Sequence, residues 1–285
     1  MSIYTGRFAP SPTGPLHFGS LVAAVASYLD AKHHNGHWLL RIEDLDPPRE
    51  SSAAPRQIIE QLKAHGFEVG DDILYQSTRL EAYAVALKAL IESSVAYRCD
   101  CNRKDLPPVY PGTCRSKAEI TEPYTYRFRT KGIVEFEDLI LGHCEFNMEK
   151  QIGDFIIRRK DQLIAYQLAV VVDDEFQGVT HIMRGADLLD STPRQIQLID
   201  ALEYARPKYG HIPVALGPDG KKLSKQSHAP ELENQSATDN LKRALRYLGQ
   251  EMPNVTSPAT ILKIAASTWN PDRIPKIPEI PAKQV

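Results

Sequence analysis

Apolar and polar positions in the first hundred residues alternate between the period of strands and the period of helices. Short, mostly apolar runs bounded by turn residues predict strands, whereas longer runs with apolar positions three or four residues apart predict helices. The predicted strands cover residues 3–8, 37–42 and 72–75, and the predicted helices cover residues 21–29, 55–66 and 78–94. Such an alternation is typical of an α/β nucleotide-binding fold.

The pattern changes at about residue 97. A cysteine-bearing segment is followed by strand-like runs at residues 124–129, 133–138, 144–147 and 155–158. Helix and strand patterns then alternate again, which predicts that the middle segment is inserted between two halves of one sheet. The later predicted elements are helices 164–173 and 192–204, strands 178–184 and 211–216, and helices 239–248 and 258–268.

The end of the chain carries clear signals of its own. Ser257 is a suitable N-cap and Pro258 suits the first position of the last helix. From Asn270 onward the sequence is rich in proline, so we expect an extended or mobile tail. We therefore divide the chain into a first catalytic half (1–96), an inserted lobe (97–163), a second catalytic half (164–227) and a C-terminal helical region with its tail (228–285).

The charge balance argues against a dedicated nucleic-acid-binding protein. The net charge is −2 and the sequence pI is near 6.5, so any contact with RNA must be a local patch. Each candidate patch is more often a solvated face than an RNA contact: 158–160, 206–208, 221–222 and 242–246. No apolar run of membrane-spanning length and no secretory leader is present, so we expect no membrane span and a cytoplasmic protein, for which a monomer is our prediction.

The first chemical signal is the junction between the strand 3–8 and the helix that follows it. Residues 9–20 read Ala-Pro-Ser-Pro-Thr-Gly-Pro-Leu-His-Phe-Gly-Ser, a tight turn that runs into a helix N-terminus. Free N–H groups and the positive end of the helix dipole suit an anion such as a triphosphate. Neither of the common phosphate-binding glycine motifs is present. The alternative is a rigid surface turn with His17 as a capping or core residue.

A second signal lies two hundred residues later. Residues 217–226 form a glycine-rich segment that ends in closely spaced lysines and a serine. Flexible ammonium groups can follow phosphate charge as it shifts, which a pyrophosphate leaving group requires. A solvated run of charges is the alternative for this loop.

Together these segments resemble the two signature motifs of class I aminoacyl-tRNA synthetases. Residues 17–20 (His-Phe-Gly-Ser) stand where the HIGH motif stands, and residues 222–226 (Lys-Leu-Ser-Lys-Gln) stand where KMSKS stands. Residues 41–49 are similar to the RIEDTD-type segment of the glutamyl and glutaminyl enzymes, and residues 165–174 and 178–187 resemble two further segments of that subfamily. The resemblance implies a Rossmann-type catalytic domain with an inserted zinc-bearing α+β lobe and a small C-terminal helical region.

Length decides which member of the family the chain resembles most. About 60 residues follow the lysine loop, whereas glutamyl-tRNA synthetases carry a long anticodon-binding helical region there. The match is closest to a shortened paralogue that activates glutamate with ATP and Mg²⁺, without needing tRNA for activation. That paralogue transfers the glutamate to the queuosine base in the anticodon of tRNA(Asp). The alternatives are a short synthetase that charges the 3′-terminal adenosine, and a catalytically idle protein that binds RNA or amino acid.

The resemblance also implies the roles of individual residues. His17 and Lys225 are the catalytic candidates, which neutralise charge on the α-phosphate and on the leaving pyrophosphate. The expected ATP-binding residues are Pro10, His17, Gly19, Ser20, Lys222, Leu223, Ser224 and Lys225. The expected glutamate-binding residues are Arg7, Ala9, Ser11, Glu43, Tyr166 and Arg184. Arginine can chelate a carboxylate, and Glu43 supplies the charge that complements the α-ammonium.

Two of these assignments have structural alternatives. The charged residues of the segment 41–46 could form an ion-pair ladder on the surface at a strand end. Tyr166 could be a half-buried helix aromatic with no ligand.

Three departures from the family pattern affect the expected activity. Ser20 replaces the second histidine of the HIGH motif, and its hydroxyl is too short to guarantee contact with the phosphates. Val170 stands where glutamyl-tRNA synthetases have an asparagine in the amino-acid pocket, so we expect one polar contact to be lost. A missing hydrogen bond to a charged group costs ~1.5–3 kcal/mol. Gln226 closes the lysine loop where serine is common.

Three of the four cysteines lie within sixteen residues and suggest a metal site. Cys99, Cys101 and Cys114 form a C-x-C pair followed by a third thiol, a spacing that suits tetrahedral Zn²⁺. The family pattern of C-x-C and Y-x-x-x-C implies Cys99, Cys101, Tyr110 and Cys114 as ligands of one structural zinc. The residues alone leave the fourth ligand open among Tyr110, His143 and Cys144. Free buried thiols are the alternative.

Overall fold

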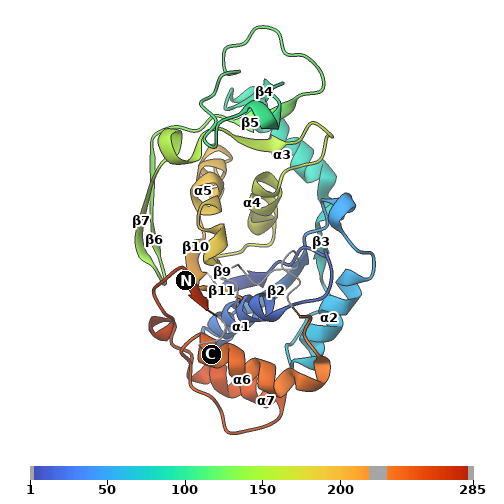
Figure 1. Cartoon of the computed structure of the whole chain (residues 1–285), viewed down its shortest axis with the longest axis vertical. Coiled ribbons are helices and arrows are strands. Elements are labelled where there is room, and N and C mark those ends of the chain that lie inside the picture. The colour runs from blue at the N-terminus through green and yellow to red at the C-terminus, as the bar shows by residue number, and fades with distance from the viewer. Residues whose placement is uncertain (1–2, 218–229, 282–285) are drawn as a thin grey trace.

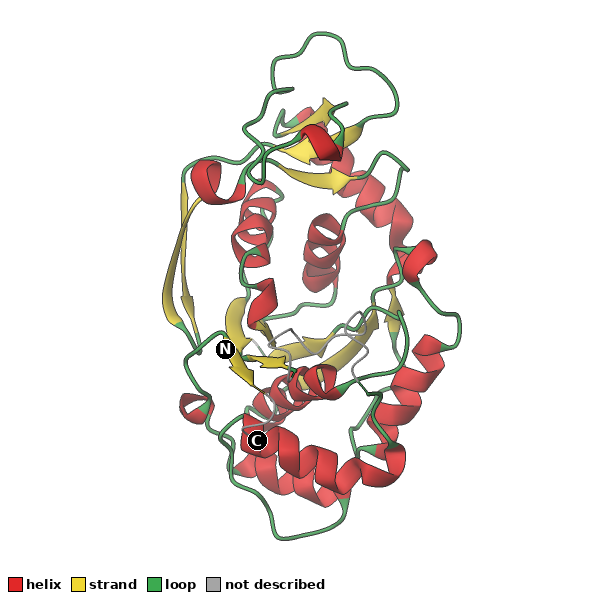
Figure 2. Ribbon diagram, in the orientation of Figure 1, coloured by secondary structure: helices red, strands yellow, loops and turns green. Residues whose placement is uncertain are grey.

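The computed structural model describes residues 3–217 and 230–281, and its centre is a parallel sheet (Figures 1 and 2). Strands β1 (Thr5–Phe8), β2 (His37–Ile42) and β3 (Leu74–Tyr75) pair in parallel in that order. Helices connect them, as parallel strands require. The predicted strand at 72–75 is thus confirmed over its last two residues only.

The second half of the sheet begins next to β1. The Thr180 backbone N–H donates to the Thr5 carbonyl at 2.9 Å, which brings β9 (His181–Gly185) alongside β1. Strand β10 (Lys208–Ile212) pairs in parallel with β9. Because the strand order reverses between β1 and β9, a ligand crevice is expected beyond the carboxyl ends of these two strands.

Helices flank this sheet on both sides (Figure 1). Helix α1 lies among β1, β2, β9, α6 and α7, whereas α3, α4 and α5 belong to a second core above the sheet. The α-helices of the described residues are α1 (Phe18–His33), α2 (Ala54–Ala64), α3 (Leu80–Glu92), α4 (Tyr166–Phe176), α5 (Ser191–Ala201), α6 (Ala237–Tyr247) and α7 (Pro258–Ser267). Single helical turns are η1 (Pro47–Arg49), η2 (Gln76–Arg79), η3 (Arg103–Asp105), η4 (Met148–Ile152), η5 (Ala186–Leu188), η7 (Asn234–Ser236) and η8 (Pro271–Arg273).

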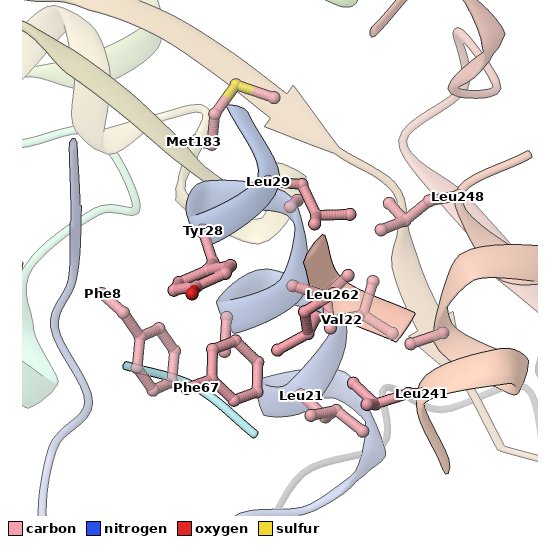
Figure 3. Packing of buried hydrophobic residues seen from close by; sticks show 14 of the residues in the cluster. Phe8, Leu21, Val22, Tyr28, Leu29, Phe67, Met183, Leu241, Leu248 and Leu262 are labelled. Atoms are coloured by element: carbon pink, nitrogen blue, oxygen red, sulfur yellow. The ribbon is translucent and has the colours of Figure 1, made fainter. Parts of the chain in front are cut away.

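Helix α1 is the centre of the first core. Its sequence is rich in alanine and leucine, which favours a helix, and apolar residues occupy almost every side of it. Leu21 and Val22 face Leu241 of α6 and Leu262 of α7, and Tyr28 packs edge-on against Phe67 (Figure 3). A helix buried this completely holds its N-terminus in a fixed position relative to the sheet.

The middle segment contributes to two sheets. Strands β4 (Ala96–Cys99), β5 (Thr125–Phe128) and β8 (Phe155–Arg158) form a small antiparallel sheet at one end of the molecule. Strands β6 (Ile133–Asp138) and β7 (Gly142–Asn147) form a hairpin, and Asp138 of β6 pairs with Tyr209 of β10. The hairpin therefore extends the main sheet instead of belonging to a separate lobe. The four-part division of the chain stays a prediction.

At the end of the chain one expectation needs correction and another is confirmed in one of its two alternatives. Pro213 has no N–H to donate, and the predicted strand at 211–216 is divided there, leaving β11 (Val214–Leu216) as a separate strand. The tail is ordered over its described part, where β12 (Glu279–Pro281) pairs in parallel with β11. Ile280 is buried in the first core. No described helix combines the length and the apolar character needed to cross a membrane.

Candidate functional site

A cavity of about 800 Å³ opens at the carboxyl ends of β1, β2 and β9. Each of the six predicted glutamate-binding residues lines it: Arg7, Ala9, Ser11, Glu43, Tyr166 and Arg184. The turn and helix start predicted for ATP also line it: Pro10, His17, Gly19 and Ser20. Residues 222–225, which contain the rest of the predicted ATP site and Lys225, lie outside the described residues. The cavity thus brings together predicted residues from four separate parts of the chain.

His17 is the N-cap of α1 at the wall of this cavity. Its ring nitrogen Nδ1 accepts from the Ser20 backbone N–H at 3.3 Å, and its Nε2 lies 3.1 Å from the Ser20 hydroxyl. The capping alternative is therefore correct as a description of this conformation, and the ring also lines the cavity. Ser20 contacts His17 directly, so the hydroxyl that replaces the expected second histidine orients the first one.

A buried ion-pair network between β1, β2 and α4 stands behind the cavity wall that Arg7 and Glu43 form. Asp174 of α4 accepts from Arg7 Nε and Nη2 at 3.2 and 3.3 Å, and its Oδ1 lies 2.8 Å from Arg41 Nη1. Arg41 also contacts Glu43 at 3.4 Å. Arg41 is fully buried, so the alternative of a surface ladder is wrong for this pair. The network fixes a cation, Arg7, and an anion, Glu43, on one wall.

The acidic members of this network differ in protonation behaviour. Burial opposes ionisation of Asp174, but Arg41 and Arg7 outweigh it and lower the pKa of its carboxyl. For Glu43 burial dominates and raises the pKa, although Arg41 and Arg7 favour the ionised form. An added cation in the cavity, such as an ammonium group, would therefore stabilise the ionised form of Glu43.

Arg184, at the end of β9, adds a second cation to the wall of the cavity. It is buried, and its guanidinium donates to His211 Nε2 at 3.1 Å, Gln195 Oε1 at 2.8 Å and Thr192 Oγ1 at 2.7 Å. Tyr166, half-buried at the start of α4, faces the same cavity. Burial raises the pKa of its phenol, so the hydroxyl stays a neutral hydrogen-bonding group.

Sequence reasoning missed the residues behind this wall. Asp174, Thr192, Gln195 and His211 have no assigned role in the motifs, yet they hold Arg7 and Arg184 in place. One available signal was the carboxylate pair at 173–174, because two acids in an otherwise apolar helix need buried partners. Val170, expected to affect the amino-acid pocket, is fully buried in the second core.

The three clustered cysteines come together in the small lobe. The sulfur atoms of Cys99, Cys101 and Cys114 all lie within 4.8 Å of one another. The Tyr110 hydroxyl oxygen lies 3.3 Å from Cys99 Sγ and 3.7 Å from Cys101 Sγ. A tetrahedral zinc with ordinary bond lengths places sulfur and oxygen ligands about 3.5 Å apart. The spacing of these four groups therefore fits one zinc ion.

The other candidates for a fourth ligand lie elsewhere. His143 hydrogen-bonds Glu137 on the β6–β7 hairpin, and Cys144 Sγ contacts the Gly142 carbonyl. Burial alone raises the pKa of Cys99, but hydrogen bonds from Tyr110 and Arg127 lower it to about 7. Cys99 therefore ionises more readily than Cys114, whose pKa burial raises to about 11, and a thiol must lose its proton to bind a metal.

Comparisons with known proteins agree with this geometry. Residues 4–109 and 110–249 match the family model of class I tRNA synthetases (E and Q), catalytic domain. A glutamyl-Q tRNA(Asp) synthetase from Pseudomonas entomophila is 47% identical over 98% of this chain and 97% of its own length. This chain belongs to the glutamyl-Q tRNA(Asp) synthetase family. The relative of that name from Pseudomonas aeruginosa PAO1 is 46% identical over 100% of this chain and 99% of its own length.

Solved structures show that the glutamyl-Q tRNA(Asp) synthetase family shares the fold of larger enzymes. A glutamate tRNA ligase from Elizabethkingia meningosepticum, solved in complex with its amino acid, has a TM-score of 0.81 at 23% identity and covers 98% of this chain. A glutamate-tRNA synthetase from Elizabethkingia anophelis has a TM-score of 0.82 at 23% identity. This chain covers 67% and 68% of those two chains. The Rossmann-type catalytic fold is thereby confirmed.

Proposed function

We propose that this protein activates glutamate with ATP and transfers the glutamyl group to the queuosine base in the anticodon of tRNA(Asp). The observation that carries the proposal is the composition of one cavity. Its walls hold two fixed arginines, Arg7 and Arg184, and a buried carboxylate, Glu43, next to the N-terminus of α1. A dicarboxylic amino acid carries two anions and one cation, which match these three groups.

The activation step needs no nucleophile from the protein. An oxygen of the glutamate α-carboxylate attacks the α-phosphorus of ATP, the bond between that phosphorus and the oxygen bridging it to the β-phosphate breaks, and glutamyl-adenylate and pyrophosphate form. In the transfer step the glutamyl group passes from the adenylate to queuosine and AMP leaves. The protein's contribution is to align the two substrates and to stabilise negative charge on the phosphates. His17, Gly19 and Ser20 at the start of α1 line the cavity, and we place those phosphates there because a helix N-terminus favours anions. Lys225 is the proposed partner of the leaving pyrophosphate.

Two metals belong to the proposal. Cys99, Cys101, Tyr110 and Cys114 hold one zinc ion, which orders the small lobe. Mg²⁺ arrives with ATP, because this ion is usually held by substrate phosphates together with one or two carboxylates and several waters. A cytoplasmic monomer stays a prediction.

Glutamate-dependent exchange of labelled pyrophosphate into ATP tests the activation step. We expect exchange with zinc-loaded protein in the absence of tRNA, and we expect Lys225→Ala to slow it while glutamate binding, measured by calorimetry, changes little. Lys242→Ala, on α6 away from the cavity, is the matched control. Folded protein that supports no exchange would refute the activation step, and full activity of Lys225→Ala would remove Lys225 from it.

A further inference from the structure

A buried polar group stands directly behind Arg184. His211 on β10 is the register partner of Arg184 on β9, and both side chains are almost completely shielded from water. His211 does not line the cavity, whereas Arg184 does. Any influence of His211 on a ligand must therefore pass through the arginine.

The hydrogen bonds around His211 specify its tautomer. Asp138 Oδ2 lies 2.5 Å from Nδ1, and Asp138 Oδ1 accepts from the His211 backbone N–H at 3.1 Å. Arg184 Nε–H can only donate, so Nε2 of His211 must accept and carry no proton. Nδ1 therefore carries the proton and donates it to Asp138, and burial lowers the pKa of the ring, which keeps it neutral.

The donor capacity of Arg184 is divided between the protein and the cavity. A guanidinium has five N–H groups. Nε donates its hydrogen to His211, Nη1 donates one hydrogen to Gln195, and Nη2 donates one to Thr192. Among the described residues, no other group accepts a hydrogen bond from this side chain. One N–H on Nη1 and one on Nη2 are left, which is the number that a carboxylate needs for two parallel hydrogen bonds.

We propose that His211, held in one tautomer by Asp138, is a positioning residue that fixes the Arg184 guanidinium for a carboxylate of the substrate. This inference rests on the proposed function, because it takes glutamate as the ligand of Arg184. Thr192 and Gln195 accept from the two terminal nitrogens of the guanidinium, whereas His211 accepts from Nε, and its ring is itself held at Nδ1 by Asp138 and at Nε2 by Thr192. His211 is thus the acceptor that sets the plane of the guanidinium.

The His211 ring donates to Asp138 and accepts from Arg184, and two substitutions of His211 separate these roles. His211→Asn retains a donor near Asp138 but is too short to accept from Arg184, whereas His211→Gln places an amide oxygen near the lost Nε2. We expect His211→Asn to raise the KM for glutamate in pyrophosphate exchange about tenfold, the effect of one charge-assisted hydrogen bond. The KM for ATP should change less than threefold, and His211→Gln should restore the glutamate KM to within about threefold of wild type.

Control measurements distinguish a loss of Arg184 positioning from a loss of fold and from failure of the proposed function. His181→Asn makes the same replacement on β9 outside the cavity and should leave the glutamate KM unchanged. The assignment is overturned if His211→Asn leaves the glutamate KM unchanged, or if both His211 variants raise the KM values for glutamate and ATP together. If His211→Asn does not fold, a tenfold rise in glutamate KM for His211→Gln overturns it and a wild-type value supports it. Wild-type protein that binds no glutamate in calorimetry would overturn the proposed function, and this assignment with it.

Discussion

Asp174 is the residue on which the charged wall of the cavity depends. It is buried and forms ion pairs with both Arg7 and Arg41, which come from two neighbouring strands. Removing the charge of one partner leaves the other charges buried without compensation, which is costly inside a protein. The position therefore serves the fold and the site at once.

We expect Asp174→Asn to lower the free energy of unfolding by about 3 kcal/mol or more. Chemical denaturation monitored by fluorescence measures this change. Asp200→Asn is the control, because Asp200 pairs with Arg206 on the surface and such pairs contribute at most about 1 kcal/mol. Equal effects of the two substitutions would contradict the importance of the buried network.

The lowered pKa of Asp174 also predicts a pH dependence. An aspartate whose pKa is lower in the folded state contributes stability that is complete above the unfolded value, about 3.9. That stability is lost as the pH falls through the folded value. Below about pH 4 the free energy of unfolding should fall less steeply for Asp174→Asn than for wild type, by at most ~1.4 kcal/mol per pH unit. Parallel pH profiles of the two proteins would show that Asp174 carries no such linkage.

At the residue scale, sequence predicted the cavity-facing side chains but not their supports. Arg7, Glu43 and Arg184 were found from motifs because each belongs to a short recognisable segment. His211 and Asp138 are 73 residues apart and meet only because β10 pairs with β6. Long-range pairing of this kind leaves no local pattern, so the second layer of the site could not be predicted.

At the scale of elements, the thiol cluster lies beside the small sheet β4–β5–β8. Metal analysis can test whether this cluster binds an ion. Cys99 ends β4, and Tyr110 and Cys114 lie in the long connection to β5. Because few apolar residues pack there, a metal would supply much of the order of this connection.

We expect purified protein to contain one zinc per chain by elemental analysis, and Cys101→Ser to lose it. Hydrogen exchange should then increase in the connection between β4 and β5 and stay unchanged in α1. Cys144→Ser is the matched control, because Cys144 lies outside the cluster and should leave the zinc content intact. Zinc retained by Cys101→Ser, or lost equally from both variants, would contradict the ligand assignment.

The tail strand β12 offers a second test at this scale. Ile280 is 8% exposed and packs in the core of α1, whereas Ile277 is 49% exposed. We expect Ile280→Ala to lower the free energy of unfolding by about 2–4 kcal/mol, the cost of truncating a buried isoleucine. Ile277→Ala should change it by less than about 0.5 kcal/mol. A mobile tail, the other alternative that the proline content allows, would make both substitutions neutral in chemical denaturation.

Most elements were nevertheless predicted from apolar periodicity alone. The helices at 54–64, 80–92 and 237–247 and the strands of the first half lie within a few residues of their predicted positions. Proline content correctly indicated an extended tail, but it left open whether that segment is ordered or mobile. Whether an extended segment finds a strand to pair with depends on tertiary structure, here on β11.

At the scale of the whole molecule, the cavity lies where the strand order of the central sheet reverses, between β1 and β9. The fold class was predicted from the order of the signature motifs, and the family match and the solved structures confirm it. The acceptor nucleoside could not be predicted from a motif, because RNA is recognised by surface shape and not by a short sequence pattern. Activation and transfer are thus separate parts of the proposed function.

The most direct test of the account is to locate transferred glutamate on tRNA. The protein is incubated with labelled glutamate, ATP, Mg²⁺ and bulk tRNA, and the tRNA is digested with ribonuclease and separated. We predict that the label is found on the queuosine-containing anticodon fragment of tRNA(Asp) and is absent when the tRNA lacks queuosine. Label on the 3′-terminal adenosine, or no label on any tRNA, would contradict the account.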